Sequence, residues 1–251
     1  MTLDIITSPL LAPRHGFFTR KGGSSSGIFA GLNCGRGSSD QSDAVQINRE
    51  RAADALDLAE PALRGLNQVH SADVIVAGPE APAAPPRADA LVTAAPGIGL
   101  AVLTADCQPV LFADAEAGVI GAAHAGWRGT LAGVLEATLE AMESLGARRA
   151  ATRAVIGPCI SQRAYEVGPE FFYEVTAEDP AYSRFFANGE GDRMLFDLPG
   201  FGLHRLRAAG IGAAEWTGHC TCSDPARFFS YRRAVQRGEF DYGRLISIIR
   251  L

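Results

Sequence analysis

Apolar residues recur along this chain with two different spacings, one typical of strands and one of helices. Short apolar runs bounded by turn residues predict a strand-rich centre, over residues 66–77, 88–93, 99–106, 109–114 and 118–125. The segment 16–33 is predicted to be a strand followed by a Gly/Ser-rich loop, and further strands are expected at 153–156 and at the C-terminus.

Helical spacing appears in four other segments. The apolar positions predict helices over 43–58, 129–145 and 199–209, and a further helix beginning near Pro169. The Pro/Ala-rich stretch 79–87 cannot hold regular structure and is predicted to be an exposed connection. The predicted strands and helices do not alternate regularly in βαβ order along the chain, which favours an α/β or α+β fold with a mixed sheet.

Composition and charge narrow the function classes. The 251 residues are enough for one large or two small domains, and the net charge of -5 argues against a nucleic-acid partner. No apolar run approaches the roughly 20 residues that span a bilayer, so no membrane association is expected. The N-terminus does not resemble a signal peptide, and five Cys residues without a disulfide-scaffold pattern fit a reducing cytoplasm.

Three residues in the centre of the chain carry the candidate chemistry. They are His70 in N-Q-V-H-S, Cys107 in T-A-D-C-Q-P-V and His124 in A-A-H-A-G-W-R-G. Two imidazoles and a thiolate suit zinc, and three protein ligands leave the fourth position of a catalytic zinc open. A lone His is more often structural, but each of these residues is predicted to lie in or at the end of a strand. We therefore expect one shared metal site.

The same residues allow a second chemistry. Cys107 could act as a nucleophile with His124 as its base. Asp106, next to Cys107, is a candidate acid/base or a group that orients a ligand His, although turn amides could equally satisfy it.

Arginines supply a candidate anion site. Arg20 lies in the Gly/Ser-rich loop, Arg128 lies at the start of the helix predicted after His124, and Arg232 lies in F-F-S-Y-R-R. Each could be a solvated surface charge, but the position of Arg128 so close to His124 favours phosphate binding.

Familiar enzyme motifs are missing from the sequence. There is no dinucleotide-binding or P-loop glycine pattern, no H-E-x-x-H, no G-x-S-x-G and no zinc-deaminase signature. The H-C-T-C run at 219–222 lacks a second pair at zinc-finger spacing, so we interpret its cysteines as reduced thiols.

Seven motifs in order resemble the laccase-domain family, also called multicopper polyphenol oxidase or YfiH-type proteins. They are Q-V-H, A-D-A-L-V-T, T-A-D-C-Q-P-V, H-A-G-W-R-G, I-G-P-C-I, Y-E-V-G and F-F-S-Y-R-R. The resemblance covers nearly the whole chain. It implies a single α/β domain over residues 1–251, with a mixed β-sheet sandwich flanked by helices. It also implies a zinc held by the residues at positions 70, 107 and 124.

The resemblance further implies an enzyme acting on purine nucleosides and phosphate. Family members phosphorolyse adenosine, inosine and methylthioadenosine and deaminate adenosine, and some are linked to editing of peptidoglycan precursors. Three alternatives stay open. One is a cysteine hydrolase that cleaves an amide in a cell-wall precursor, the second is a copper-dependent polyphenol oxidase, and the third is a non-catalytic metal-binding protein.

The histidine count weakens the oxidase alternative. A multicopper centre binds its copper ions mainly through histidines, and this chain has five His in total. Cu²⁺ could still replace Zn²⁺ in the predicted site, because copper has the higher intrinsic affinity for such ligands. Oxidase activity arising in that way would be adventitious.

Overall fold

Two β-sheets stacked face to face form the centre of the molecule. In the computed structural model, which describes residues 2–251, the larger sheet has six strands in the order β13-β9-β7-β8-β5-β4. These strands are β4 (Val74–Val76), β5 (Ala90–Thr93), β7 (Gln108–Asp114), β8 (Val119–Ala125), β9 (Arg153–Ile156) and β13 (Ala213–Trp216). Its outer pairs, β13 with β9 and β4 with β5, are parallel, while the central pairs are antiparallel.

The second sheet has five strands in the order β1-β2-β14-β6-β3. They are β1 (Ile5–Ile6), β2 (His15–Phe18), β3 (Leu63–Arg64), β6 (Gly99–Thr104) and β14 (Leu245–Arg250). The β3–β6 pair is parallel and the other pairs are antiparallel.

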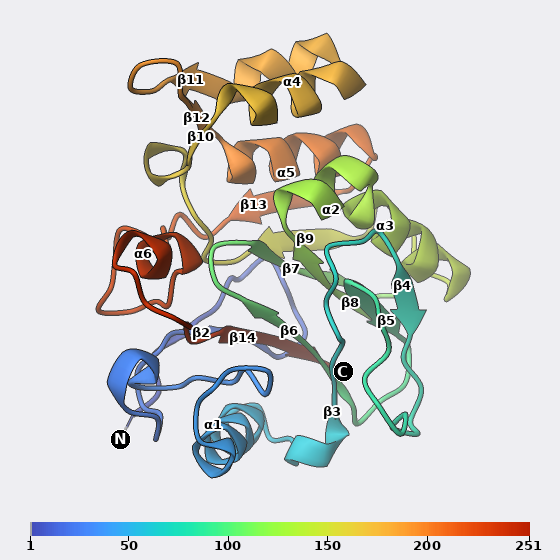
Figure 1. Cartoon of the computed structure of the whole chain (residues 1–251). Helices are drawn as coiled ribbons and strands as arrows, with labels where there is room; N and C mark the ends of the chain where they lie inside the picture. The colour runs from blue at the N-terminus through green and yellow to red at the C-terminus, as the bar shows by residue number, and fades with distance from the viewer. Residues whose placement is uncertain (1) are drawn as a thin grey trace.

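Helices cover the outer faces of both sheets (Figure 1). Helix α1 (Ser42–Asp54) lies against the five-stranded sheet. Helices α2 (Trp127–Ala132), α3 (Val134–Ser144) and α5 (Leu198–Ala208) lie on the six-stranded sheet. Beyond α5 lie α4 (Pro169–Glu178) and a three-stranded sheet of β10 (Glu166–Val167), β12 (Met194–Phe196) and β11 (Phe186–Asn188).

The remaining helical segments are short. They are α6 (Tyr231–Gln236) and four 3₁₀ helices: η1 (Gly27–Phe29), η2 (Glu60–Ala62), η3 (Gln162–Ala164) and η4 (Pro180–Phe185).

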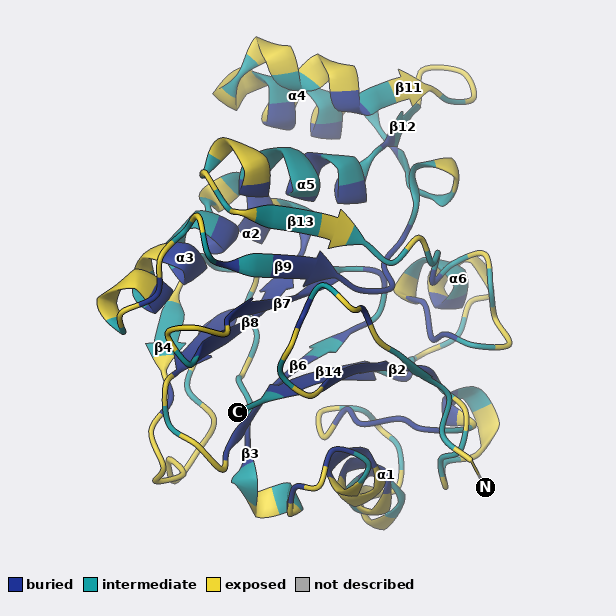
Figure 2. Ribbon diagram, turned by 180° about the vertical axis from the view of Figure 1, so that it is seen from behind, coloured by how far each residue is buried: buried dark blue, intermediate teal, exposed yellow. Residues whose placement is uncertain are grey.

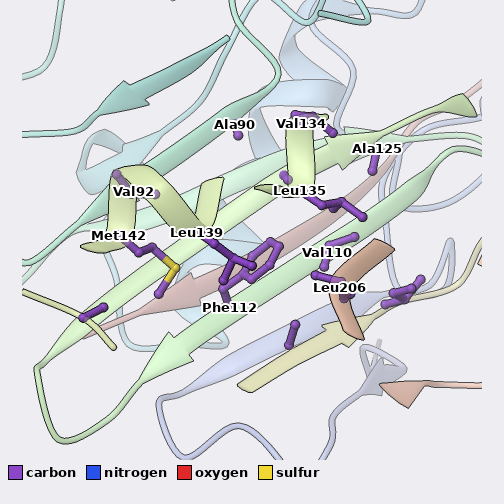
Figure 3. Packing of buried hydrophobic residues seen from close by; sticks show 14 of the residues in the cluster. Ala90, Val92, Val110, Phe112, Ala125, Val134, Leu135, Leu139, Met142 and Leu206 are labelled. Atoms are coloured by element: carbon purple, nitrogen blue, oxygen red, sulfur yellow. The ribbon is translucent and has the colours of Figure 1, made fainter. Parts of the chain in front are cut away.

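Side-chain alternation along the strands builds a core on both faces of the six-stranded sheet. In β7, Leu111 faces the five-stranded sheet, whereas Val110 and Phe112 face the helices, as expected where successive side chains point to opposite faces. Figure 2 shows the resulting burial of the central strands. In Figure 3, Leu139 and Met142 of α3 pack against the sheet that carries Phe112.

The predicted fold class, a mixed α/β sandwich flanked by helices, is confirmed. Two element predictions are wrong. Residues 66–77 form a strand only at β4, because most of this segment is a loop. The helix predicted over 129–145 is two helices, because Gly133 between α2 and α3 adopts a left-handed conformation with φ 96°. That conformation interrupts a helix but leaves the apolar spacing unchanged.

Candidate metal centre and cleft

His70, Cys107 and His124 come together at one edge of the sandwich. Each offers one ligand atom, and these atoms lie within 4.8 Å of one another. The Cys107 Sγ lies 3.8 Å from the His70 Nε2, and the two imidazole rings are 4.7 Å apart between centroids, edge to face. The geometry therefore offers a His-Cys-His donor set that could hold a metal ion.

The sheet topology explains how the residues meet. The chain crosses from β6 in one sheet to β7 in the other over residues 105–107, which places Cys107 immediately before β7. Strand β8 runs antiparallel to β7 with His124 opposite Pro109, so the end of β8 returns to the start of β7. His70 enters from the loop before β4.

Asp89 holds two of these residues in place. One carboxylate oxygen of Asp89 lies 2.8 Å from His124 Nδ1. The other accepts hydrogen bonds from the backbone N–H groups of Val69 and Ser71, on either side of His70, at 3.1 and 2.6 Å. His70 itself has a left-handed backbone with φ 62°, which is uncommon for a residue with a side chain. The buried carboxylate therefore fixes the bend that presents His70.

These contacts also set the charges of the site. Burial raises the pKa of the Asp89 carboxyl, but hydrogen bonds from His124 and Ser71 outweigh burial and leave this pKa well below its usual range. Burial raises the pKa of the Cys107 thiol, but the charge and hydrogen bonds of His124 and His70 lower it overall from 9.0 to about 6. Burial lowers the pKa of His124, yet Cys107 and Asp89 raise it overall to about 9. The site therefore stabilises a thiolate, the form of Cys that binds metals and acts as a nucleophile.

Gly126 packs closely against the side chains of His70 and Cys107. A Cβ atom at this position would lie 2.9 Å from His70 Cδ2 and 3.0 Å from Cys107 Sγ. Only glycine therefore fits between the end of β8 and the two ligand side chains without displacing them.

A cleft with two lobes opens at this centre. The larger lobe, about 600 Å³, is lined by His70, Cys107 and His124 together with residues such as Asn67 and Arg244. The second lobe, about 390 Å³, shares His70, Ala105, Cys107 and Tyr231 with the first. The candidate metal centre therefore lies where the lobes join.

Two of the predicted phosphate-binding arginines line the second lobe. Arg128 lies over the ring of Trp127, with its Cζ 4.5 Å from the ring centroid. Arg232 lies 5.3 Å from the centroid of Tyr165 and donates a hydrogen bond to the Glu166 carbonyl. This lobe thus combines aromatic rings with two guanidinium groups.

Asp106 and Arg20 have different surroundings from those expected. The Asp106 carboxylate accepts hydrogen bonds from the Thr221 and Ser230 hydroxyls and the Arg232 N–H, rather than orienting a ligand His. Through these hydrogen bonds Asp106 connects the segment before Cys107 to residues near α6. Arg20 is not among the residues that line either lobe; it lies in a separate pocket because its guanidinium donates to the carbonyls of Ala30 and Pro225.

The sequence reasoning missed three kinds of residue at this site. Asp89 stands in the motif A-D-A-L-V-T, but only its acidic side chain directly before a buried strand could have indicated its role. The glycine of H-A-G-W-R-G was not recognised as a close-approach position. The aromatic residues of the second lobe gave no pattern that distinguishes them from core residues.

Comparison with known proteins places the chain in a family. The family described as multi-copper polyphenol oxidoreductase laccase matches residues 14–251. The chain belongs to this family. A Deinococcus radiodurans relative named purine nucleoside phosphorylase is 44% identical, over 99% of this chain and 93% of the relative. The Escherichia coli relative, purine nucleoside phosphorylase YfiH, is 40% identical over 88% of each chain.

Solved structures of the laccase-like family share the fold. A Neisseria meningitidis protein, 36% identical, superposes with a TM-score of 0.88 over 99% of this chain and 98% of its own. YlmD from Geobacillus stearothermophilus, 29% identical, gives a TM-score of 0.87 over 97% and 93%. Within residues 2–251, no helix combines the length and apolar character that crossing a membrane requires.

Proposed function

We propose that this protein is a zinc-dependent purine nucleoside phosphorylase that also deaminates adenosine. The observation that carries the proposal is the His-Cys-His donor set at the junction of two cleft lobes, one of them lined by aromatic rings and arginines. The relatives named purine nucleoside phosphorylase, which align over most of this chain, support the substrate class.

The donor set fits zinc. A tetrahedral zinc with Zn–S of about 2.3 Å and Zn–N of about 2.0–2.1 Å places its sulfur and nitrogen ligands about 3.5 Å apart. The Cys107 Sγ and His70 Nε2 are separated by 3.8 Å, so a small movement would bring them to that spacing. His70, Cys107 and His124 would hold the ion; the larger lobe of the cleft reaches all three residues and the second lobe reaches His70 and Cys107.

A bound zinc ion would supply Lewis-acid polarisation to a group in the cleft. Asp89 keeps the proton of His124 on Nδ1 and thereby leaves the Nε2 lone pair for the metal. The same carboxylate positions His70 through the amides on either side of it. One residue therefore orients both imidazoles before any ligand binds.

The cleft can accommodate a nucleoside together with an anion. Its lobes of about 600 and 390 Å³ lie in the range of small-molecule sites. Trp127, Tyr165 and Tyr231 offer aromatic surfaces against which a purine can stack. Arg128 and Arg232 offer fork-shaped donors for phosphate. We propose that the phosphate consumed in phosphorolysis binds in this second lobe.

The test is a product assay with matched variants. Zinc-loaded wild type, Cys107→Ala and Cys220→Ser are incubated with adenosine, with and without phosphate, and the products are separated by chromatography. Cys220 is the control because its thiol lies outside both lobes of the cleft. We expect adenine and ribose 1-phosphate only with phosphate, and deamination to inosine and ammonia whether or not phosphate is present. Both reactions should be lost in Cys107→Ala and retained in Cys220→Ser.

Other outcomes would reassign the protein. Ammonia without base cleavage at saturating phosphate would leave a deaminase and reject the phosphorylase. Full activity of Cys107→Ala would remove Cys107 from the mechanism. A covalent thiol adduct during turnover of an amide substrate by the metal-free protein would favour the cysteine hydrolase. Turnover of a phenol, and not of adenosine, by copper-loaded protein would favour the oxidase.

A further inference from the structure

A small basic pocket lies between the loop after β2 and helix α6. It has a volume of about 220 Å³, and its charged lining residues are Arg20, Arg233, Arg237 and Glu239. Neither lobe of the cleft includes any of these four residues. The basic pocket therefore needs an explanation separate from the proposed nucleoside site.

The fold holds two of the guanidinium groups in fixed positions. Arg20 donates to the carbonyls of Ala30 and Pro225, and its Cζ lies 4.3 Å above the ring of Phe229. Arg233 donates to the carbonyls of Thr221, Cys222 and Phe228. Backbone carbonyls thus orient both side chains without neutralising them, and two of the five N–H groups of each guanidinium remain for another acceptor.

Helix α6 brings the third arginine to the same pocket. Arg237 follows Arg233 by four residues, at the C-terminal end of the helix, and residues four apart on a helix are neighbours. Like charges at this spacing destabilise a helix slightly. The arrangement is therefore unfavourable unless an opposite charge lies nearby.

The acidic groups nearby balance this charge only in part, although the charge of Asp106, which Ser230 separates from Arg233, also attracts Arg233. Three guanidinium groups face one carboxylate, so the basic pocket carries an excess of two positive charges. Glu239 lies 3.8 Å from Arg237, and within residues 2–251 no carboxylate oxygen lies within ion-pair distance of Arg20 or Arg233. Burial, and then the charge of Arg233, lower the pKa of Arg20. Removing part of the water around these cations is unfavourable, so an anion bound between them would be stabilised.

We infer that the basic pocket binds a tetrahedral dianion, either inorganic phosphate or the phosphoryl group of a phosphomonoester. Arginine forks match phosphate oxygens through paired, charge-assisted hydrogen bonds. A dianion would neutralise the excess of two positive charges, and its size suits a cavity of this volume. This phosphate site is distinct from the lobe that contains Arg128. The binding of an anion in the basic pocket can therefore be tested independently of the proposed phosphorylase activity.

The test measures phosphate binding by calorimetry in an Arg128→Gln background, which removes an arginine of the cleft. Inorganic phosphate should still bind with one site per chain. Adding Arg237→Gln should weaken that binding tenfold or more, because a hydrogen bond to a charged group is lost. Arg237 is exposed, so this variant should fold normally. Adding Arg207→Gln, at an exposed arginine of α5, is the matched control and should leave the affinity unchanged.

Ribose 5-phosphate then distinguishes the two sources of the anion. If it displaces phosphate, the pocket accepts the phosphoryl group of a larger molecule; if it does not, the pocket is specific for free phosphate, and both results support the site. Absence of phosphate binding in the Arg128→Gln background would overturn the inference. Equal affinities in the Arg237→Gln and Arg207→Gln proteins would also overturn it.

Discussion

Asp89 shows how one buried carboxylate can position the residues of a candidate metal site without belonging to the donor set. Its two oxygens contact His124 and the amides beside His70, so both imidazoles depend on it. Groups that orient metal ligands affect affinity strongly even though they do not touch the ion. The left-handed φ of 62° at His70 is an uncommon conformation that these amide contacts stabilise.

We expect Asp89→Asn to lower zinc affinity by roughly 10–100-fold, because the amide no longer fixes the tautomer of His124 through a charged acceptor. Competition with a chromophoric chelator measures the affinity. Asp73→Asn, at an exposed aspartate in the same region, is the control and should bind zinc like wild type. Unchanged affinity in Asp89→Asn would show that the carboxylate is not needed to orient the ligands.

Gly126→Ala should impair the same site by a different route. The added methyl would lie about 3 Å from both the His70 ring and the Cys107 sulfur, closer than carbon and sulfur atoms normally approach. Metal content after dialysis should fall, while circular dichroism should show an intact fold. Gly78→Ala is the control, since a Cβ atom there would meet no atom within 4 Å. Stoichiometric zinc in Gly126→Ala would mean that the ligands can move aside.

At the scale of elements, the buried strands were predictable and the loop that carries His70 was not. Strands β6, β7 and β8 are largely apolar runs of 6 or 7 residues. Their short length and the turn residues between them distinguish such runs from buried helices. The residues around Val69 and Val74 also have strand character, but the hydrogen bonds to Asp89 bend the chain between them. That contact joins distant parts of the sequence, so no local pattern reveals it.

In the candidate site, too, the sequence predicted the residue types but not the contacts between distant residues. Ligand-type side chains indicated His70, Cys107 and His124 as candidate ligands, because few residue types bind zinc, and the structure brings the three together. The supporting groups were not predictable in this way. His124 and Asp89 are separated by 35 residues, and their contact depends on the pairing of β8 with β5. Residue type therefore indicated the candidate ligands, while the topology determined how they are positioned.

The β7–β8 hairpin yields a prediction about acid stability. Asp114, at the end of β7, accepts hydrogen bonds from the backbone N–H groups of Glu116, Ala117 and Arg148. Burial raises the pKa of Asp114, but these bonds outweigh it and lower the pKa below 3.8. A depressed pKa contributes stability that is fully present above the unfolded value and is lost as the pH falls through the folded value.

We therefore expect Asp114→Asn to reduce the free energy of unfolding at pH 7 by about 1–3 kcal/mol, since one amide donor then faces an NH₂ group. The difference from wild type should shrink as the pH falls below about 4. Urea unfolding at several pH values measures both effects. Glu116→Gln, at an exposed carboxylate of the same turn, should change stability by less than about 0.5 kcal/mol. A deficit that is the same at pH 3 and pH 7 would contradict the proposed ionisation.

At the scale of the whole molecule, the three candidate ligands come from parts of the fold that are separate in sequence. Cys107 lies where the chain passes from the five-stranded to the six-stranded sheet, His124 lies in β8, and His70 lies in the loop before the edge strand β4. A bound ion would therefore connect the crossing between the two sheets to the edge of the larger one. Binding to such a site stabilises the folded state, because the unfolded chain does not hold the ligands together.

Removing the metal should consequently lower the thermal stability of the whole protein. With free zinc at 100 times its Kd, binding adds about 2.7 kcal/mol to the free energy of unfolding. For a chain of this size that corresponds to a fall in Tm of about 5–10 °C on chelation. Calorimetry of the zinc-loaded and chelator-treated wild type measures the difference. Cys220→Ser should show the same shift, whereas Cys107→Ala should begin near the Tm of the metal-free protein and respond little to chelation. An equal shift in Cys107→Ala would place the stabilising ion elsewhere in the molecule.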